Sequence, residues 1–247
     1  MSEKHGHIRV RRYSGSARIN HWIVAVTFVC LAVSGLALFH PSLFWLTALF
    51  GGGQMARWLH PWFGLVLAVS FFGLFVRFLS QNLPERTDWV WLTRIRDVMA
   101  SREDYLPEVG KYNAGQKLVF WSQAVLISIL LVTGIGLWLA AVANIEALTG
   151  FKPTIDQLRW AAVIHATAAV LAIMVWIVHV YAAIWVRGTF AAMIQGSVTG
   201  GWGWRHHRKW LRSEVKKGDI ERDVGADAPG KRPSSGASRG GGMHASP

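Results

Sequence analysis

Four stretches of the chain lack every Asp, Glu, Lys and Arg residue, and this feature constrains the fold more than any other. They cover residues 22–39, 58–76, 118–145 and 160–186. Each has at least 18 residues, and a helix of about 20 residues crosses the hydrocarbon core of a bilayer. Because lipid offers no water to unpaired backbone groups, such spanning segments are helical. The sequence therefore predicts an all-α integral membrane protein, a bundle of four transmembrane helices.

Positively charged residues alternate between rich and poor segments along the chain. Segments 1–21, 77–117 and 187–247 hold 23 of the 26 Lys and Arg residues, and the connections 40–57 and 146–159 hold the other three. Loops rich in Lys and Arg stay on the cytoplasmic side of a membrane. We therefore expect both termini and the middle loop in the cytoplasm and the two poor connections outside. This is the topology of a multi-pass membrane protein, whose outer connections lie in the periplasm if the cell is Gram-negative.

Composition divides the chain into four regions. Residues 1–20 form a cytoplasmic N-terminal segment, 21–187 the membrane domain, 188–223 a basic and aromatic cytoplasmic segment, and 224–247 a tail rich in Gly, Ser, Ala and Pro. The composition of the tail is typical of disorder. The run 202–210 mixes Trp with Arg, Lys and His, a mixture that also suits nucleic acid. Because it follows a membrane helix, we expect anionic lipid headgroups, and no nucleic acid, as its partner.

Four of the ten histidines lie at or inside the spans, where ionisable residues are costly and mark functional sites. They are His21, His60, His165 and His179. The alternating direction of the spans places His60 and His165 near the outer surface, and His21 and His179 near the cytoplasmic surface. One such histidine alone could equally hydrogen-bond a neighbouring helix. Two pairs at matched depths predict a shared function instead.

The two histidines of the fourth span share a face of the predicted helix. His165 and His179 are 14 residues apart, which corresponds to about 21 Å along a helix and to nearly the same direction around it. Small residues occupy the rest of that face and leave room for a flat group beside it. They are Ala168, Ala169, Ala172, Ala182 and Ala183.

Two imidazoles at each depth suit an iron ion whose other four positions are filled by a porphyrin. We therefore predict two b-type haems, the inner one held by His21 and His179 and the outer one by His60 and His165. A zinc site would instead gather three or four ligands at one depth. The chain has a single cysteine, Cys30, and no CxxCH motif. This excludes an iron–sulfur cluster and a covalently attached haem.

Several segments resemble the gamma subunit of membrane-bound respiratory formate dehydrogenase, a di-haem cytochrome b that is related to the b-type subunit of nickel–iron hydrogenases. The most specific is the run 110–117, GKYNAGQK. The matching segments are 18–22, 54–61, 109–117, 164–166, 179–181 and 185–188. Together they extend the resemblance over most of residues 15–215.

The resemblance implies a set of partners and an electron route. A molybdenum- or tungsten-containing catalytic subunit would oxidise formate, and an iron–sulfur subunit would pass the electrons to the outer haem of this chain. From the inner haem, the electrons would reduce menaquinone or ubiquinone on the cytoplasmic side. Complexes of this family can assemble into higher oligomers.

The resemblance also implies a quinone site beside the inner haem, formed by Asn113, Gly115, Gln116 and His179. The amides of Asn113 and Gln116 suit hydrogen bonds to a quinone carbonyl, and Gly115 permits a close approach. However, Asn and Gln three residues apart before an apolar helix are also typical of a helix N-cap. One loop can serve both purposes.

Two alternatives stay open at this point. A nickel–iron hydrogenase or another periplasmic dehydrogenase would use the same haem ligands with a different partner, bound at the outer connections. A transporter that uses the four histidines would need acidic residues within the spans, and the four spans contain no Asp or Glu.

Overall fold

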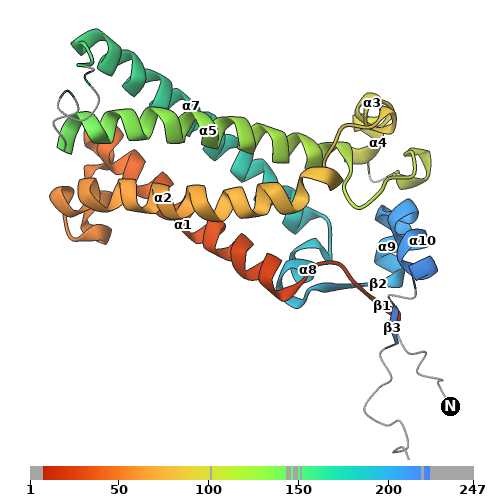
Figure 1. Cartoon of the computed structure of the whole chain (residues 1–247). Helices are drawn as coiled ribbons and strands as arrows, with labels where there is room; N and C mark the ends of the chain where they lie inside the picture. Colours follow the sequence, from red (N-terminus) through yellow and green to blue (C-terminus); the bar gives the residue numbers. More distant parts are fainter. Residues whose placement is uncertain are drawn as a thin grey trace, which may run out of the picture.

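Four long helices run alongside one another and form the body of the molecule (Figure 1). They are α1 (Gly15–Phe39), α2 (Gly53–Phe78), α5 (Ala114–Val142) and α7 (Ile155–Trp185). The computed structural model describes residues 8–100, 102–142, 146, 150, 152–217 and 220–222, so the tail 224–247 lies outside the described residues. All four helices are long and apolar enough to cross a membrane, which confirms the predicted bundle.

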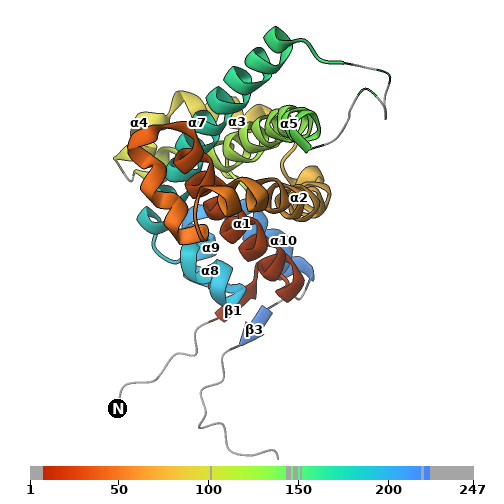
Figure 2. The same ribbon diagram turned by 90° about the vertical axis from the view of Figure 1, so that its left-hand side faces the viewer.

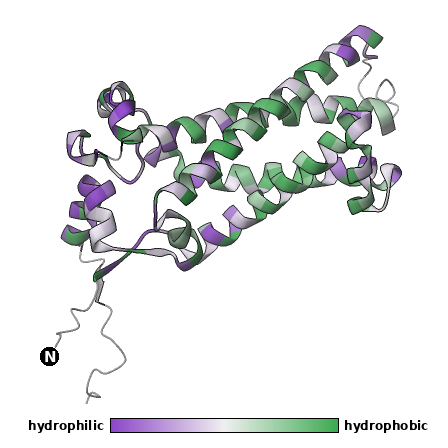
Figure 3. Cartoon of the chain, turned by 180° about the vertical axis from the view of Figure 1, so that it is seen from behind, coloured by the Kyte–Doolittle hydropathy of each residue, from purple (hydrophilic) through white to green (hydrophobic). Residues whose placement is uncertain are grey.

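Apolar side chains cover the outside of the bundle as well as its interior. Val69, Phe72 and Val132 are 75%, 67% and 73% exposed, respectively. Figure 3 shows apolar residues along most of the length of the long helices and hydrophilic residues gathered mainly around their ends. So large an exposed apolar surface indicates contact with lipid. The protein is therefore a multi-pass membrane protein.

Polar residues cap the first turns of α1, α5 and α7, and these helices begin before the charge-free stretches. The Ser14 hydroxyl accepts a hydrogen bond from the Ala17 N–H (3.3 Å) at the start of α1. Thr154 and Gln157 form a capping box at the start of α7. Helix α5 begins at Ala114, four residues before the expected span. The charge-free stretches thus mark the part of each helix that faces lipid, rather than the whole helix.

The connection between α1 and α2 contains a 3-10 helix that the sequence did not indicate, η1 (Pro41–Phe50). His40 caps it, because its Nδ1 accepts a hydrogen bond from the Ser42 N–H (3.2 Å). The connection between α5 and α7 lies at the same end of the bundle. Most of residues 143–151 are outside the described residues.

Short elements form a compact terminal module at the opposite end of the bundle (Figures 1 and 2). The module consists of β1 (Ile8–Arg11), α8 (Thr189–Gln195), β2 (Ser197–Thr199), α9 (Gly200–His206), α10 (Arg208–Lys217) and β3 (Ile220–Arg222). Its strands form an antiparallel sheet in the order β2–β1–β3. The middle loop adds η2 (Leu79–Gln81), α3 (Arg86–Thr93), α4 (Ile95–Met99) and η3 (Glu103–Tyr105) at this end.

The basic and aromatic run 202–210, which we expected on lipid headgroups, is partly built into this module. Trp210 belongs to the apolar core of the module, together with Val10 and Val198. Trp210 is 6% exposed, whereas Trp204 is 50% exposed. The sequence did not reveal this core because its strands pair over nearly 190 residues of chain. Lipid contact stays a prediction for the exposed part of the run.

A buried cation, Arg12, joins the module to the loop before α5. Its guanidinium lies over the indole rings of Trp202 (4.9 Å) and Trp210 (4.8 Å). It also donates a hydrogen bond to the Lys111 carbonyl oxygen (2.5 Å). Arginine stacked on aromatic faces is attracted by their negative electrostatic potential. These contacts hold three distant segments of the chain together.

His207 completes this joint as a neutral ring. Its Nδ1 donates to the Gly110 carbonyl oxygen (2.8 Å). Its Nε2 accepts from the Arg12 guanidinium (3.3 Å), since an arginine can only donate. Burial, and then the Arg12 charge, lower the pKa of His207 to about 3. This role was not predicted, because His207 follows the last span and its partners are distant in the chain.

This joint predicts a pH-dependent stability of the terminal module. The pKa of His207 lies near 6.5 when the module is unfolded and near 3 when it is docked. The docked state is therefore most stable above pH 6.5 and loses about 1.4 kcal/mol for each pH unit between 6.5 and 3. Hydrogen exchange of residues 200–217, corrected for intrinsic rates, should accelerate on acidification. The His207→Gln variant should lose most of this pH dependence, and an equal dependence in both proteins would contradict the assignment.

Candidate functional site

The four histidines of the spans meet in two pairs at the two ends of the bundle. His21 of α1 faces His179 of α7, with 6.3 Å between the ring centroids. His60 of α2 faces His165 of α7, also with 6.3 Å between the ring centroids. The His21–His179 pair lies at the end that carries the terminal module, and the His60–His165 pair lies at the end that carries η1. Helix α7 contributes one ring to each pair.

Both rings of the His60–His165 pair have a hydroxyl partner. The Ser34 hydroxyl lies 2.7 Å from Nδ1 of His60, and the Thr133 hydroxyl lies 2.9 Å from Nδ1 of His165. Ser34 is fully buried. In both rings the contact occupies Nδ1 and leaves Nε2 as the nitrogen that can bind a metal ion.

Each ring of this pair also packs against a glycine. A Cβ atom at Gly35 would stand 3.3 Å from Cε1 of His60, and one at Gly134 would stand 3.1 Å from Cε1 of His165. Both distances are shorter than ordinary van der Waals contacts. The lack of a side chain at these two positions therefore makes room for the imidazoles.

The His21–His179 pair has a different environment. Nδ1 of His21 is buried and has no hydrogen-bond partner among the described residues. The His21 ring contacts Trp22 edge to face (5.6 Å between centroids). His179 is exposed, whereas the other three histidines are half-buried. A buried nitrogen without a protein partner is costly.

The alanines of α7 do not all leave the open face that we expected. Ala168 and Ala172 are 4% and 1% exposed, because neighbouring helices cover them. Ala172 packs with Phe28 and Leu67 in an apolar cluster at mid-depth. Ala182, close to His179, is exposed. The expected face of small residues is therefore covered by packing at Ala168 and Ala172 and exposed at Ala182.

The loop before α5 forms the capping box that its sequence suggested. The Asn113 N–H donates to Oε1 of Gln116 (3.1 Å), and the Gln116 N–H donates to Oδ1 of Asn113 (3.0 Å). A Cβ at Gly115 would stand 3.1 Å from the Trp91 ring, so this glycine permits close packing against α3. No hydrogen bond joins these residues to His179 in the described parts of the chain, although both lie at the module end.

Two titratable residues precede this capping box. Burial, and then the charge of Arg12, lower the pKa of Lys111 to about 8. Burial and the neighbouring Tyr13 raise the pKa of Tyr112 well above its usual value. A lysine with a pKa near neutrality can take up and release protons at physiological pH.

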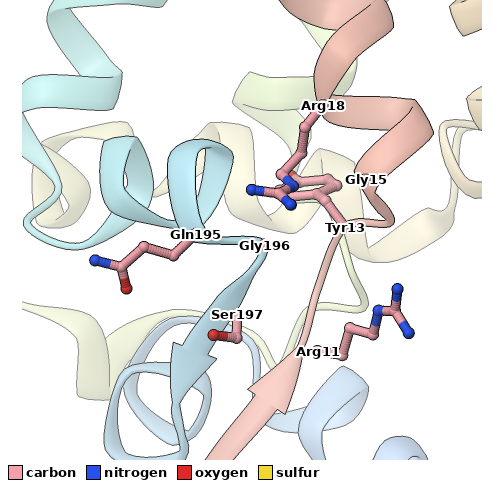
Figure 4. Close-up of a pocket in the computed structure, with 7 residues that line it drawn as sticks. All are labelled: Arg11, Tyr13, Gly15, Arg18, Gln195, Gly196 and Ser197. Atoms are coloured by element: carbon pink, nitrogen blue, oxygen red, sulfur yellow. The ribbon is translucent and has the colours of Figure 1, made fainter.

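A small cavity of about 150 Å³ lies where the start of α1 meets the terminal module (Figure 4). Arg18 extends from α1 toward Gly196, and a Cβ at Gly196 would stand 3.1 Å from the Arg18 Nε. The Arg12 and Tyr13 N–H groups donate to the Gly196 carbonyl oxygen (2.8 and 3.0 Å). None of the predicted site residues lines this cavity. Its contacts anchor the first turn of α1, one turn before His21.

Sequence comparison identifies the family. The profile of the prokaryotic cytochrome b561 family matches residues 12–196. The chain belongs to this family. One similar protein is the "Formate dehydrogenase, cytochrome b556(fdo) subunit" of Escherichia coli K12. It is 42% identical to this chain over 208 residues. The alignment covers 83% of this chain and 93% of the relative.

Two further proteins that are similar to this chain have names of the same kind. The "Formate dehydrogenase, nitrate-inducible, cytochrome b556(Fdn) subunit" of Escherichia coli K12 is 39% identical over 206 residues, which are 83% of this chain and 91% of the relative. The "Formate dehydrogenase, cytochrome b556 subunit" of Haemophilus influenzae is 33% identical over 223 residues, 90% of each chain. These matches confirm the resemblance noted in the sequence.

The cytochrome b561 family implies a haem b, and the geometry of both histidine pairs fits one. A metal–imidazole bond measures about 2 Å and the ring centre lies about 1 Å behind the nitrogen, so two rings on one ion have centroids about 6 Å apart. Both pairs have this spacing. Among the described residues, no group of three or more metal-binding side chains comes together. Each pair thus offers two imidazoles, the number of protein ligands that a b-type haem iron could take.

The glycine beside His165 provides a test of this geometry. The Gly134→Ala substitution should displace the His165 ring at an overpacking cost of about 1–3 kcal/mol, and should lower the haem b content per chain. The Gly136→Ala substitution is the matched control on the same helix, because its Cβ would meet no atom within 4 Å. Pyridine haemochrome assays measure the content. Equal haem content in both variants would contradict the packing argument.

Proposed function

We propose that this protein is the membrane-anchoring di-haem cytochrome b subunit of a respiratory formate dehydrogenase, which carries electrons from an iron–sulfur subunit to quinone. The observation that supports it most is the pair of imidazoles at each end of a transmembrane bundle. The relatives that bear a formate dehydrogenase name favour this enzyme over a nickel–iron hydrogenase. Formate oxidation itself belongs to a molybdenum- or tungsten-containing partner subunit.

In this proposal the four histidines would hold the irons of two haems. His21 and His179 hold the inner haem b, and His60 and His165 hold the outer haem b. The two haems supply reversible one-electron chemistry at two depths. The chain fixes these depths through α7, because His165 and His179 are separated by 14 residues, or about 21 Å of helix. The apolar cluster around Phe28 and Leu67 excludes water from the region between the two histidine pairs.

The orientation in the inner membrane follows from the positive charges. The segments rich in Lys and Arg belong on the cytoplasmic side, which puts the His21–His179 pair inside and η1 outside. Helix η1 exposes Phe44 (49%), Trp45 (67%) and Leu49 (71%). Exposed apolar side chains in a connection suit a docking surface for another protein. We therefore assign the contact with the iron–sulfur subunit to this outer end.

Quinone reduction is assigned to the cytoplasmic end, at Asn113, Gly115, Gln116 and His179. The capping box occupies Oδ1 of Asn113 and Oε1 of Gln116. The amide NH₂ groups of both residues are not used by the box and are suited to donate to a quinone carbonyl. The helix cap and the proposed ligand contact are therefore compatible.

This arrangement converts redox energy into a membrane potential. Electrons enter at the outer side, and the protons that quinone reduction consumes come from the cytoplasm. Each electron that moves inward against about 100 mV requires about 2.3 kcal/mol. Lys111, with a pKa of about 8, is placed next to the proposed quinone site and can hold a proton there.

Replacement of the histidines tests the ligand assignment. The wild-type protein should bind two haem b groups per chain, and each of the single variants His21→Ala, His60→Ala, His165→Ala and His179→Ala should retain one. The control variant His40→Ala, which lies outside both pairs, should keep two. Pyridine haemochrome analysis of the purified proteins gives the number. Two haems in all four single variants would contradict the assignment.

The quinone assignment is tested by a substitution that preserves the helix cap. Gln116→Glu keeps Oε1 as the acceptor in the capping box but removes the NH₂ donor. Quinone reduction should slow about tenfold, the effect of one lost hydrogen bond, while haem content stays at the wild-type level. Gln157→Glu is the matched control, since Gln157 occupies the same capping position at the start of α7. Equal quinone kinetics in the two variants would argue against a site at Gln116.

A further inference from the structure

The two histidine pairs differ in their hydrogen bonds, and this difference has a functional consequence. Ser34 contacts Nδ1 of His60 (2.7 Å) and Thr133 contacts Nδ1 of His165 (2.9 Å). In the described residues, neither ring of the His21–His179 pair has a hydrogen bond to a protein group. Among the described residues, the rings of His60 and His165 thus have a hydroxyl partner at Nδ1, and the rings of His21 and His179 do not.

The direction of the two hydroxyl contacts can be assigned. The Ser34 hydroxyl also lies 2.7 Å from the Cys30 carbonyl oxygen, and the Thr133 hydroxyl lies 2.7 Å from the Ile129 carbonyl oxygen. A carbonyl oxygen can only accept, so each hydroxyl proton is committed to its own helix. Each hydroxyl oxygen therefore accepts a hydrogen bond from the Nδ1–H of its histidine.

This assignment fixes the tautomer of both rings. With the proton on Nδ1, the lone pair of the neutral imidazole resides on Nε2, the nitrogen that binds the iron. An acceptor at Nδ1–H increases the electron density of the imidazole and makes it a more basic ligand.

We propose that Ser34 and Thr133 are positioning residues that lower the reduction potential of the haem at His60 and His165 relative to the haem at His21 and His179. A more basic axial ligand stabilises ferric iron more than ferrous iron, and hydrogen bonds around the ligands are among the factors that set such potentials. The inference rests on the proposed function, because it requires both haems.

The order of potentials matters for the direction of electron transfer. In the proposed route, one electron would leave the haem held by His60 and His165, which would be oxidised, and would reduce the haem held by His21 and His179. This step moves negative charge toward the cytoplasm, against the membrane potential. The hydroxyl groups make the step more favourable, and so they oppose the electrical cost of crossing the membrane.

The test is a redox titration of the purified two-haem protein and its variants, followed at the haem α-band. The wild type should titrate as two components. In Ser34→Ala and in Thr133→Val, the lower-potential component should shift upward while the other component stays in place. Thr133→Ser retains the hydroxyl and should restore the wild-type value, and this variant also controls for the lost methyl group.

Two other hydroxyls provide matched controls. Thr27 on α1 and Ser128 on α5 bond to carbonyl oxygens of their own helices and have no histidine partner among the described residues. Thr27→Val and Ser128→Ala should leave both components unchanged.

The outcomes separate this inference from the proposed function. Two haems with no shift, or with equal shifts of both components, would overturn the role of the hydroxyls and leave the ligand assignment intact. A shift of the higher-potential component alone would also overturn it. A wild-type protein with fewer than two haems would contradict the proposed function itself.

Discussion

An imidazole inside a membrane needs a partner for each of its nitrogens, because neither water nor a free backbone group is at hand. Most other features of the structure follow from this requirement. At one end of the bundle, hydroxyls of the neighbouring helices satisfy Nδ1 of His60 and His165. The rings themselves come together in pairs, with 6.3 Å between their centroids at each end. In the proposed function, an iron in a porphyrin would bind one nitrogen of each ring at both ends, and the membrane bundle would be a scaffold that holds two redox centres at a fixed separation.

The terminal module stabilises the end of the bundle that carries the His21–His179 pair. Arg12 and His207 join the N-terminal strand, the loop before α5 and the C-terminal helices. The same joint positions the first turn of α1 before His21 and the capping box before α5. The module therefore connects the proposed quinone loop to the inner histidine pair. The basic, aromatic run 202–210, which suits a membrane surface, thus also holds the module together through Trp202 and Trp210.

The parts of the fold that depend on local sequence could be predicted. The four charge-free stretches predicted the helices, and the spacing of His165 and His179 led to two sites at two depths. The parts that depend on contacts between distant segments could not. The pairing of β1 with β2, the burial of His207, and the hydroxyls of Ser34 and Thr133 beside their histidines belong to this class. Ala172 shared the right helix face, but only the packing of neighbouring helices revealed its burial.

The location of the two irons tests the central claim most directly. A cryo-EM map of the purified protein in a lipid nanodisc should contain two porphyrins, one between His21 and His179 and one between His60 and His165. The irons should be about 20 Å apart along the membrane normal, as the helical rise of α7 requires. A single porphyrin, or two porphyrins at one depth, would contradict the account.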